Sequence, residues 1–271
     1  MHEYAKVPER GGFMRLYIKF FAMHIKSQMQ YKTSFVFLLL GRMLTLAGEI
    51  MIIFFLFNRY NSVKGFTVDE ILICAAGIIM SFALAECFAR GFDTFPSVVR
   101  NGEFDRIMVR PQNEIFLVLS GKIELTRLAG LITGAVTLIY AVCTGHVVWT
   151  AGRIFTYAMM IISGTVVFSS LFLFYAGICF FTLEGLEFMN IFTDGGKNFG
   201  QYPFVIYGSY ILRFFTFIVP LALVQYYPLM YVLGKTTDKF YMFTPFIAML
   251  FVIPAYLFWR FGVRKYKSNG S

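Results

Sequence analysis

The stretch that decides the fold class is Val68–Phe88, VDEILICAAGIIMSFALAECF. It has no charged residue from Ile71 to Ala85, and acidic residues flank that apolar run on both sides. The hydrocarbon core of a bilayer is about 30 Å thick, and a helix needs about 20 mostly apolar residues to cross it. The length and composition of this stretch therefore predict a membrane-spanning helix.

The composition of the whole chain points the same way. Hydrophobic residues make up 58% of its 271 residues and charged residues only 14%, which excludes a water-soluble enzyme. A disordered scaffold is excluded as well, because disorder requires low hydrophobicity and high charge density. We therefore expect an all-α integral membrane protein.

The same length requirement, applied to the rest of the chain, predicts six spans within a single transmembrane domain, residues 1–271. These spans are Thr33–Phe57, Val68–Phe88, Ile123–Cys143, Ile154–Thr182, Val205–Val224 and Thr244–Trp259. The fourth is long enough to tilt, whereas the sixth is short. The segments between and around them are a start (1–32), a loop (91–122), a region before the last span (225–243) and a tail (260–271).

The start of the chain has an amphipathic pattern from Phe13 to Gln28. At about 100° per residue, one face of a helix collects Phe13, Leu16, Tyr17, Phe20 and His24, and the opposite face collects Arg15, Lys19 and Lys26. This pattern predicts a helix that lies in the membrane interface with its basic face toward lipid phosphates.

The distribution of basic residues predicts the orientation. With six spans both ends lie on one side, and cytoplasmic segments carry the excess of Lys and Arg. With both termini cytoplasmic, the inside segments hold Lys6, Arg10, Arg15, Lys19, Lys26, Lys32, Arg90, Arg100, Arg106, Arg110, Lys122, Lys197, Arg260, Arg264, Lys265 and Lys267. The outside segments hold only Arg59, Lys64, Arg153, Lys235 and Lys239. This asymmetry explains the net charge of +9, so we expect no nucleic-acid partner.

The loop after the second predicted span has a helical pattern of its own. Phe95, Val98 and Val99 stand at i, i+3 and i+4, Pro96 suits the first turn, and Asn101-Gly102 suits the C-terminal cap. We predict a short helix over Phe95–Arg100, which can rest on the membrane or dock into a groove of another protein.

Two sets of motifs resemble a known family. The run Val99-Arg100-Asn101-Gly102-Glu103-Phe104-Asp105, followed by Val109-Arg110-Pro111, resembles the cytoplasmic signature of type-2 ABC export permeases. A later set is similar to the pattern of a branch whose members commonly work with a sister permease: Gln201-Tyr202-Pro203, Ile206-Tyr207, Arg213, Pro220, Tyr227-Pro228 and Leu233-Gly234. The chain departs from the pattern at Pro254, which stands within an already short last span.

The resemblance implies a multi-pass permease subunit of an ATP-driven exporter in a bacterial cell membrane. Its partners would be cytoplasmic ABC ATPase subunits, a second permease that is identical or paralogous, and membrane lipids. It also implies that the amphipathic start is a connecting helix and that residues 225–243 form short re-entrant helices. A coupling helix would contact the ATPase through the loop residues Phe95, Val98, Val99, Arg100, Gly102, Phe104, Asp105, Arg110 and Pro111.

The chain shows no energy source or catalytic centre of its own. Gly234-Lys235-Thr236 matches the end of a Walker A motif, but the glycine required five positions earlier is Leu229. We therefore expect ATP and Mg²⁺ on the partner ATPase and no cofactor on this chain. The cysteines and histidines show no spacing typical of a metal site.

Four ionisable residues within the predicted spans are candidates for function: Arg42, Glu49, Glu86 and Arg213. Arg42 and Glu49 are seven residues apart, so they pair through a neighbour or face a polar cavity. Glu86 is spaced to pair with Arg90 on one helix. Arg213 lines a path for an anionic substrate or pairs with Glu49.

Two rival functions remain open. Asp93, Glu103 and Asp105 could form the carboxylate site of an integral membrane enzyme that modifies lipids. An ion-coupled carrier is the other alternative, although the chain shows no internal repeat and no broken central helices. The residues do not identify the substrate.

Overall fold

The computed structural model describes residues 12–59, 62–182 and 190–266, with side chains from Arg15 onward apart from that of Asn58. These residues form helices and one isolated β-bridge between Val63 and Phe66. Within them, five helical stretches are long and apolar enough to cross a membrane, or six if one bent helix pair is a single span. The chain is thus an all-helical protein with the character of a multi-pass membrane protein.

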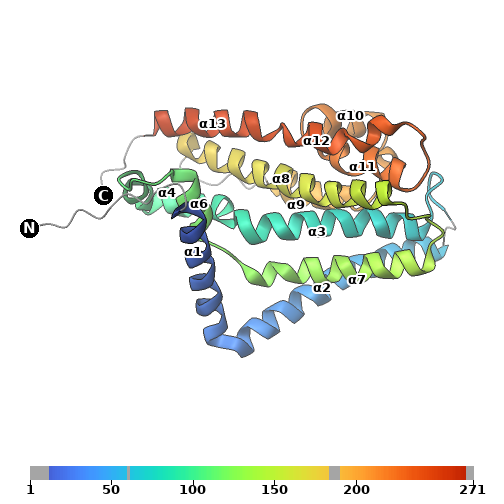
Figure 1. Cartoon of the computed structure of the whole chain (residues 1–271), viewed down its shortest axis with the longest axis horizontal. Coiled ribbons are helices and arrows are strands. Elements are labelled where there is room, and N and C mark those ends of the chain that lie inside the picture. The colour runs from blue at the N-terminus through green and yellow to red at the C-terminus, as the bar shows by residue number, and fades with distance from the viewer. Residues whose placement is uncertain (1–11, 60–61, 183–189, 267–271) are drawn as a thin grey trace, which may run out of the picture.

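The helices are named as in Figure 1. In chain order the elements are α1 (Gly12–Gln28), η1 (Met29–Tyr31), α2 (Lys32–Arg59), α3 (Val68–Asp93), α4 (Phe95–Arg100), α5 (Glu103–Met108), α6 (Glu114–Gly121), η2 (Leu125–Arg127), α7 (Leu128–Thr144), α8 (Ala151–Thr182), α9 (Asn190–Gly200), η4 (Phe204–Tyr207), α10 (Ser209–Phe217), α11 (Leu221–Val232), η5 (Lys239–Met242), α12 (Thr244–Met249) and α13 (Val252–Lys265).

Helix α3 is the central element, and it lies between α7 and α8 (Figure 1). It begins at a capping box, in which the backbone N–H of Thr67 donates to Glu70 Oε2 at 2.9 Å. Small residues let its neighbours come close: Gly130 lies against Ala83, and Gly164 lies against Ser81. The apolar stretch of α3 is buried along nearly its whole length, so this helix is the core of the bundle.

The amphipathic helix predicted over Phe13–Gln28 is confirmed by α1. It meets α2 at a steep angle, and its first turns lie beside α6 (Figure 1). The predicted apolar face is turned inward, with the ring of Tyr17 6.1 Å from that of Phe116. The predicted basic residues Arg15, Lys19 and Lys26 are exposed.

The third predicted span starts later than predicted. Lys122, Ile123 and Glu124 are extended, and the regular helix α7 begins only at Leu128. Gln28 at the end of α1 holds this extended link: its amide donates to the carbonyl of Ile123 at 2.6 Å and accepts from the backbone N–H of Leu125 at 3.0 Å. Tertiary hydrogen bonds thus replace the first turn of the predicted helix.

The prediction of one continuous fifth span over Val205–Val224 is wrong. Those residues form η4, α10 and the first turn of α11, and α10 and α11 are bent by 111°. The bend falls before Pro220, which has no backbone N–H to continue a helix. The short helix α9 precedes this pair and packs against α3, where Gly200 lies against Ile78.

The sixth predicted span is present and extends further, because Thr244–Lys265 is one of the candidate spans. Leu250 and Phe251 form a turn between α12 and α13, and Pro254 in the first turn of α13 has no backbone N–H to donate. Helix α13 then packs along α8, where Gly177 and Gly262 allow close approach. The departure noted at Pro254 thus lies next to a local turn within this span.

The bundle has two different ends (Figure 1). Helices α4 to α6 lie at one end, together with the beginning of α1 and the end of α13. Helices α10 to α12 lie at the other, with the link after α2. There Lys64 Nζ donates to the carbonyl of Val205 at 3.2 Å, and Lys235 Nζ lies 2.6 Å from Glu70 Oε2. Basic residues predicted to lie outside are therefore grouped at one end.

Candidate functional site

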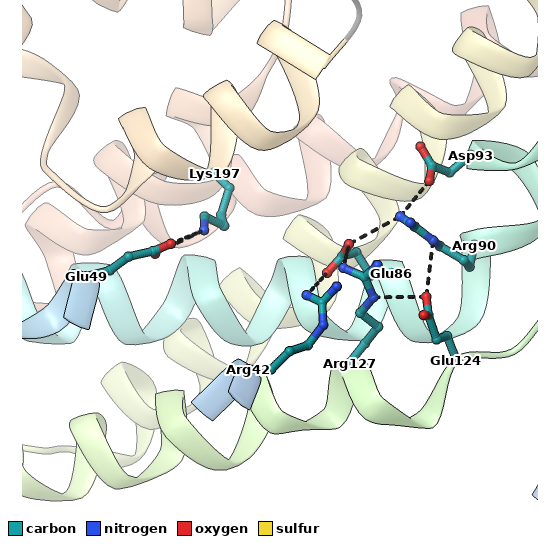
Figure 2. A network of polar contacts seen from close by, with 8 residues as sticks. All are labelled: Arg42, Glu49, Glu86, Arg90, Asp93, Glu124, Arg127 and Lys197. Carbon is teal, nitrogen blue, oxygen red and sulfur yellow. Dashed lines mark hydrogen bonds and ion pairs between the residues drawn. The ribbon is translucent and has the colours of Figure 1, made fainter. Parts of the chain in front are cut away.

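Six charged side chains form a network between α2, α3 and the start of α7, which we name the Glu86 cluster (Figure 2). Its members are Arg42, Glu86, Arg90, Asp93, Glu124 and Arg127. Glu86 Oε1 accepts a hydrogen bond from Arg127 Nη1, and Arg90 Nη1 lies 3.4 Å from the same oxygen. Both Glu86 and Arg127 are buried. The predicted pair of Glu86 with Arg90 is thus present as part of a larger network.

Arg90 and Arg127 have further acidic partners in this cluster. Arg90 Nη1 lies 2.5 Å from Asp93 Oδ2, and Arg90 Nε lies 3.2 Å from Glu124 Oε2. Arg127 Nε donates to the same oxygen of Glu124 at 3.0 Å. Three arginines face three carboxylates, so the cluster is neutral as a whole. Mutual pairing is what makes such charges tolerable inside a bundle.

Glu124 lies on the extended link outside the helical spans, and its charge is stabilised. Burial is the largest single influence and raises the pKa of its carboxyl group. The charge and hydrogen bond of Arg127, with the charges of Arg90 and Lys122, outweigh burial and hold the pKa below its ordinary value. Glu124 is therefore ionised whenever the cluster is assembled at neutral pH.

A second polar group, the Glu49 clasp, joins α2 to α9 and consists of Glu49, Lys197 and Gln201 (Figure 2 shows the first two). Lys197 Nζ donates to both carboxylate oxygens of Glu49, each at 3.0 Å, and Gln201 Nε2 donates to Oε2 at 2.7 Å. Lys197 and Gln201 are both buried. Lys197, which was predicted to lie in a cytoplasmic loop, is thus a buried residue of α9 that is paired with α2.

A cavity of about 550 Å³ lies between the two polar groups. Its charged lining comprises Arg42, Glu49, Glu86, Arg127, Asp194 and Lys197, and its apolar lining includes Phe37, Leu38, Leu46, Ile79 and Phe82. Of the two possibilities left open for Arg42 and Glu49, the structure has both facing a polar cavity. They bind different partners there: Glu86 lies 3.9 Å from Arg42, and Lys197 lies 3.0 Å from Glu49.

Arg213 does not make the predicted pair with Glu49. It lies on the short helix α10, is exposed, and does not line the cavity. Within the described part of the chain it makes no ion pair. The partner predicted for it, Glu49, is bound by Lys197 and Gln201 instead.

The loop helices α4 and α5 cover an aromatic core at the end of the bundle. Its rings are those of Phe92, Phe95, Phe104, Phe180, Trp259 and Tyr266. The Phe95 centroid lies 5.2 Å from that of Phe104 and 4.9 Å from that of Trp259. As predicted, α4 ends at Arg100 with Asn101 as its C-terminal cap, and Gly102 has a left-handed φ of 68°. The two short helices are thus joined by packing to α8 and α13.

This packing divides the nine predicted coupling residues into two groups. Phe95, Val99 and Phe104 are fully buried, so they support the loop and offer no surface to another protein. Val98, Gly102 and Asp105 are partly exposed, and Arg100, Arg110 and Pro111 are exposed. A charged substitution at Val99 or Phe104 would therefore report on folding of the loop and not on docking.

A family model described as "ABC-2 family transporter protein" matches residues 43–270, which is most of the chain. The chain belongs to this family. No curated protein and no solved structure matches it. The protein is therefore the membrane component of a transporter, as the resemblance of the loop and late-span motifs predicted.

This ABC-2 permease does not gather the carboxylates that a lipid-modifying enzyme would need. Asp93 is bound to Arg90 within the Glu86 cluster. Across residues 12–59, 62–182 and 190–266, His, Cys, Asp and Glu side chains form no group of three or more that could hold a metal ion. The carboxylate-site alternative thus has no support in the geometry.

Two central residues of the permease, Lys197 and Gln201, were missed as site residues from the sequence. Helix α9, NIFTDGGKNFG, is too polar and too short to be found by an apolar-length criterion. A usable signal was present in its pattern: the small residues Gly196 and Gly200 stand four apart on the face that packs inward.

Proposed function

We propose that this permease is one half of an ATP-driven exporter in a bacterial cell membrane, with both termini in the cytoplasm. ATP hydrolysis, with its Mg²⁺, would take place on separate ATPase subunits. Membership of the ABC-2 family supports this proposal, as does the lack of a complete Walker A motif around Lys235.

The loop of α4 and α5 is the proposed docking site for the ATPase. Its outer surface carries Arg100, Glu103, Arg106 and Arg110, which are exposed, and its inner surface is the aromatic core. A force applied to the loop would pass through Phe95 and Phe104 to the ends of α8 and α13, because close-packed interiors transmit strain. The packing of Phe95 and Phe104 against Phe180 of α8 and Trp259 of α13 is the observation that carries the proposal.

The distribution of basic residues supports the proposed orientation. The loop end carries exposed Arg100, Arg106 and Arg110, as expected of a cytoplasmic surface. At the opposite end, Lys235 is engaged by Glu70 and by the carbonyl of Gly65.

A second permease, identical or paralogous, is the proposed partner within the membrane. Helix α2 supports this because about half of its apolar side chains are exposed, among them Leu44, Ile52 and Phe55. A partner seated against α2 would lie beside the cavity and complete the wall of a path. The proposed cycle opens that path alternately to the two sides of the membrane.

The proposal is tested by purifying the tagged full-length chain from its native membrane in mild detergent and assaying what accompanies it. We expect an ATP-hydrolysing protein to co-purify with the wild type and to be lost from the variants Arg100→Glu and Arg106→Glu. Both substitutions are on exposed residues, so the fold should be retained.

The matched control is Lys239→Glu, which makes the same charge change on an exposed residue at the opposite end. It should co-purify the ATPase as the wild type does. A chain that purifies without any ATPase, or an association that both loop variants leave intact, would contradict the proposed coupling surface.

A further inference from the structure

Arg42 is the least satisfied cation of the cavity. Its side chain is 42% exposed, and its nearest acidic atom is Glu86 Oε2 at 3.9 Å, a separation too long for a hydrogen bond. Glu86 is already bound by Arg127 and Arg90. A guanidinium has five N–H donors in a planar fork. Arg42 lines the cavity and points toward Glu86 (Figure 2), and it makes no hydrogen bond within the described chain.

The position of Arg42 makes this lack of partners costly. It lies ten residues after Lys32, the first residue of α2, which places it about 15 Å along the helix at 1.5 Å per residue. An arginine at such depth in an apolar helix is expensive, and residues of this kind mark substrate or ion pathways. Lys197 on the other side of the cavity differs because Glu49 neutralises it.

The surroundings of Arg42 combine this charge with an apolar wall. Phe37 and Leu38 from α2 and Ile79 and Phe82 from α3 line the same cavity. Its volume of about 550 Å³ is that of a pocket for a small organic ligand. A ligand that fits must therefore offer an acceptor to Arg42 and hydrocarbon to the wall.

The charges around the cavity favour an anion at Arg42. The carboxylates of Glu86 and Glu49 are both bound by basic side chains, so neither is free for a cationic ligand. Asp194 also lines the cavity and is exposed, and it would repel an anion. The anionic group is therefore expected beside Arg42 and away from Asp194.

From this arrangement we infer that the cavity binds an amphiphile whose phosphate or carboxylate is held by Arg42 and whose hydrocarbon lies along Phe37, Leu38, Ile79 and Phe82. The planar fork of an arginine matches both anions with two parallel hydrogen bonds. The inference names the substrate class of the proposed permease and rests on that proposal. The same chemistry is offered by a membrane phospholipid and by a single-chain amphiphile in transit.

The test is native mass spectrometry of the full-length chain in maltoside detergent, without an ATPase, titrated with phosphatidylglycerol, phosphatidylcholine or dodecyl phosphate. We expect phosphatidylglycerol and dodecyl phosphate to bind more tightly than phosphatidylcholine. Arg42→Gln should weaken the anionic ligands about tenfold or more, the loss expected for a charge-assisted hydrogen bond, and Arg42→Lys should weaken them less. Failure of ATPase association would leave this result unaffected, so the two proposals fail separately.

The control is Arg213→Gln, which removes the same charge from an exposed arginine outside the cavity and should leave binding unchanged. Should Arg42→Gln fail to fold, Gly41→Leu tests the site without touching the charge: a Cβ at Gly41 meets no atom within 4 Å, so the added side chain would fill the cavity and weaken binding.

Three results would overturn the inference. They are equal binding of phosphatidylglycerol and phosphatidylcholine, an anion preference that Arg42→Gln leaves intact, and displacement of the amphiphile by inorganic phosphate alone. Binding of phosphatidylglycerol without dodecyl phosphate would assign the site to a resident lipid, and binding of both would assign it to anionic amphiphiles in general. Either of the last two results supports the anion site at Arg42.

Discussion

The Glu86 cluster and the Glu49 clasp are both polar groups inside an apolar bundle, but they join different things. The cluster ties α3 to the extended link and to η2, which lie against α3 in any case. The clasp joins α2 to α9, and these two helices make few other contacts with each other. Similar ion pairs thus reinforce an existing contact at one place in the permease and supply the main contact between two helices at another.

The largest effect is expected from breaking the cluster. Glu86→Ala would leave Arg90 and Arg127 without their shared carboxylate, and removing one partner of a buried ion pair costs about 3–5 kcal/mol. The thermal unfolding temperature of the full chain in mild detergent should fall markedly. Glu103→Ala, which removes an exposed glutamate on α5, serves as the control and should change it little. An unchanged temperature for Glu86→Ala would show that the cluster is not an anchor.

Breaking the clasp is expected to lower stability less than breaking the cluster does, but to change the distance between α2 and α9 more. Glu49→Gln removes the charge that holds Lys197 and should cost about 1–3 kcal/mol. The distance between spin labels at Leu44 on α2 and Asn198 on α9, in a Cys143→Ser background, should become longer and more broadly distributed. The double variant Glu49→Met with Lys197→Met should regain much of the lost stability, because apolar replacement of both partners is often tolerated. A distance distribution like that of the wild type would argue against a clasp.

The smallest change in stability is expected when Glu124 becomes protonated at acid pH. Its pKa is held below the ordinary value of about 4.5, so its carboxylate stabilises the fold above that pH. This stabilisation is lost as the pH falls through the lower pKa of the folded state. Comparing wild type with Glu124→Gln between pH 7 and pH 3 should show a stability difference that shrinks below about pH 4.5. A difference that stays constant over this range would show that the pairs of Glu124 do not stabilise the fold.

The sequence was most informative where one apolar run forms one helix. Helices α3 and α8 cover their predicted spans because their burial and their apolar length coincide. The helix α4 was predictable from local signals alone, since Pro96, the spacing of Phe95, Val98 and Val99, and Gly102 all act within a few residues.

The fifth and third spans were mispredicted for two different physical reasons. The apolar criterion chose Val205–Val224 from composition alone, and composition does not predict the 111° bend between α10 and α11. The start of α7 depends on hydrogen bonds from Gln28, which is 95 residues away from Ile123 in the chain. Neither feature can be predicted from the composition of the segment in which it occurs.

The candidate site was predicted in its residue types better than in its pairings. Arg42, Glu49 and Glu86 stand out because charges in apolar helices are rare. Which of them meet depends on the relative placement of α2, α3 and α9, so Arg213 was matched to Glu49 in place of Lys197. Pairing is a property of the packed bundle and not of spacing along one helix.

The loop of α4 and α5 can pack fully only after the later residues of its aromatic core have been synthesised. Trp259 and Tyr266 belong to the last stretch of the chain, and both pack against Phe104. Chains are made from the N-terminus, so the loop emerges long before these two rings exist. A nascent chain halted before Trp259 would present the loop without its support, and a fully packed loop therefore marks a chain translated at least as far as Tyr266.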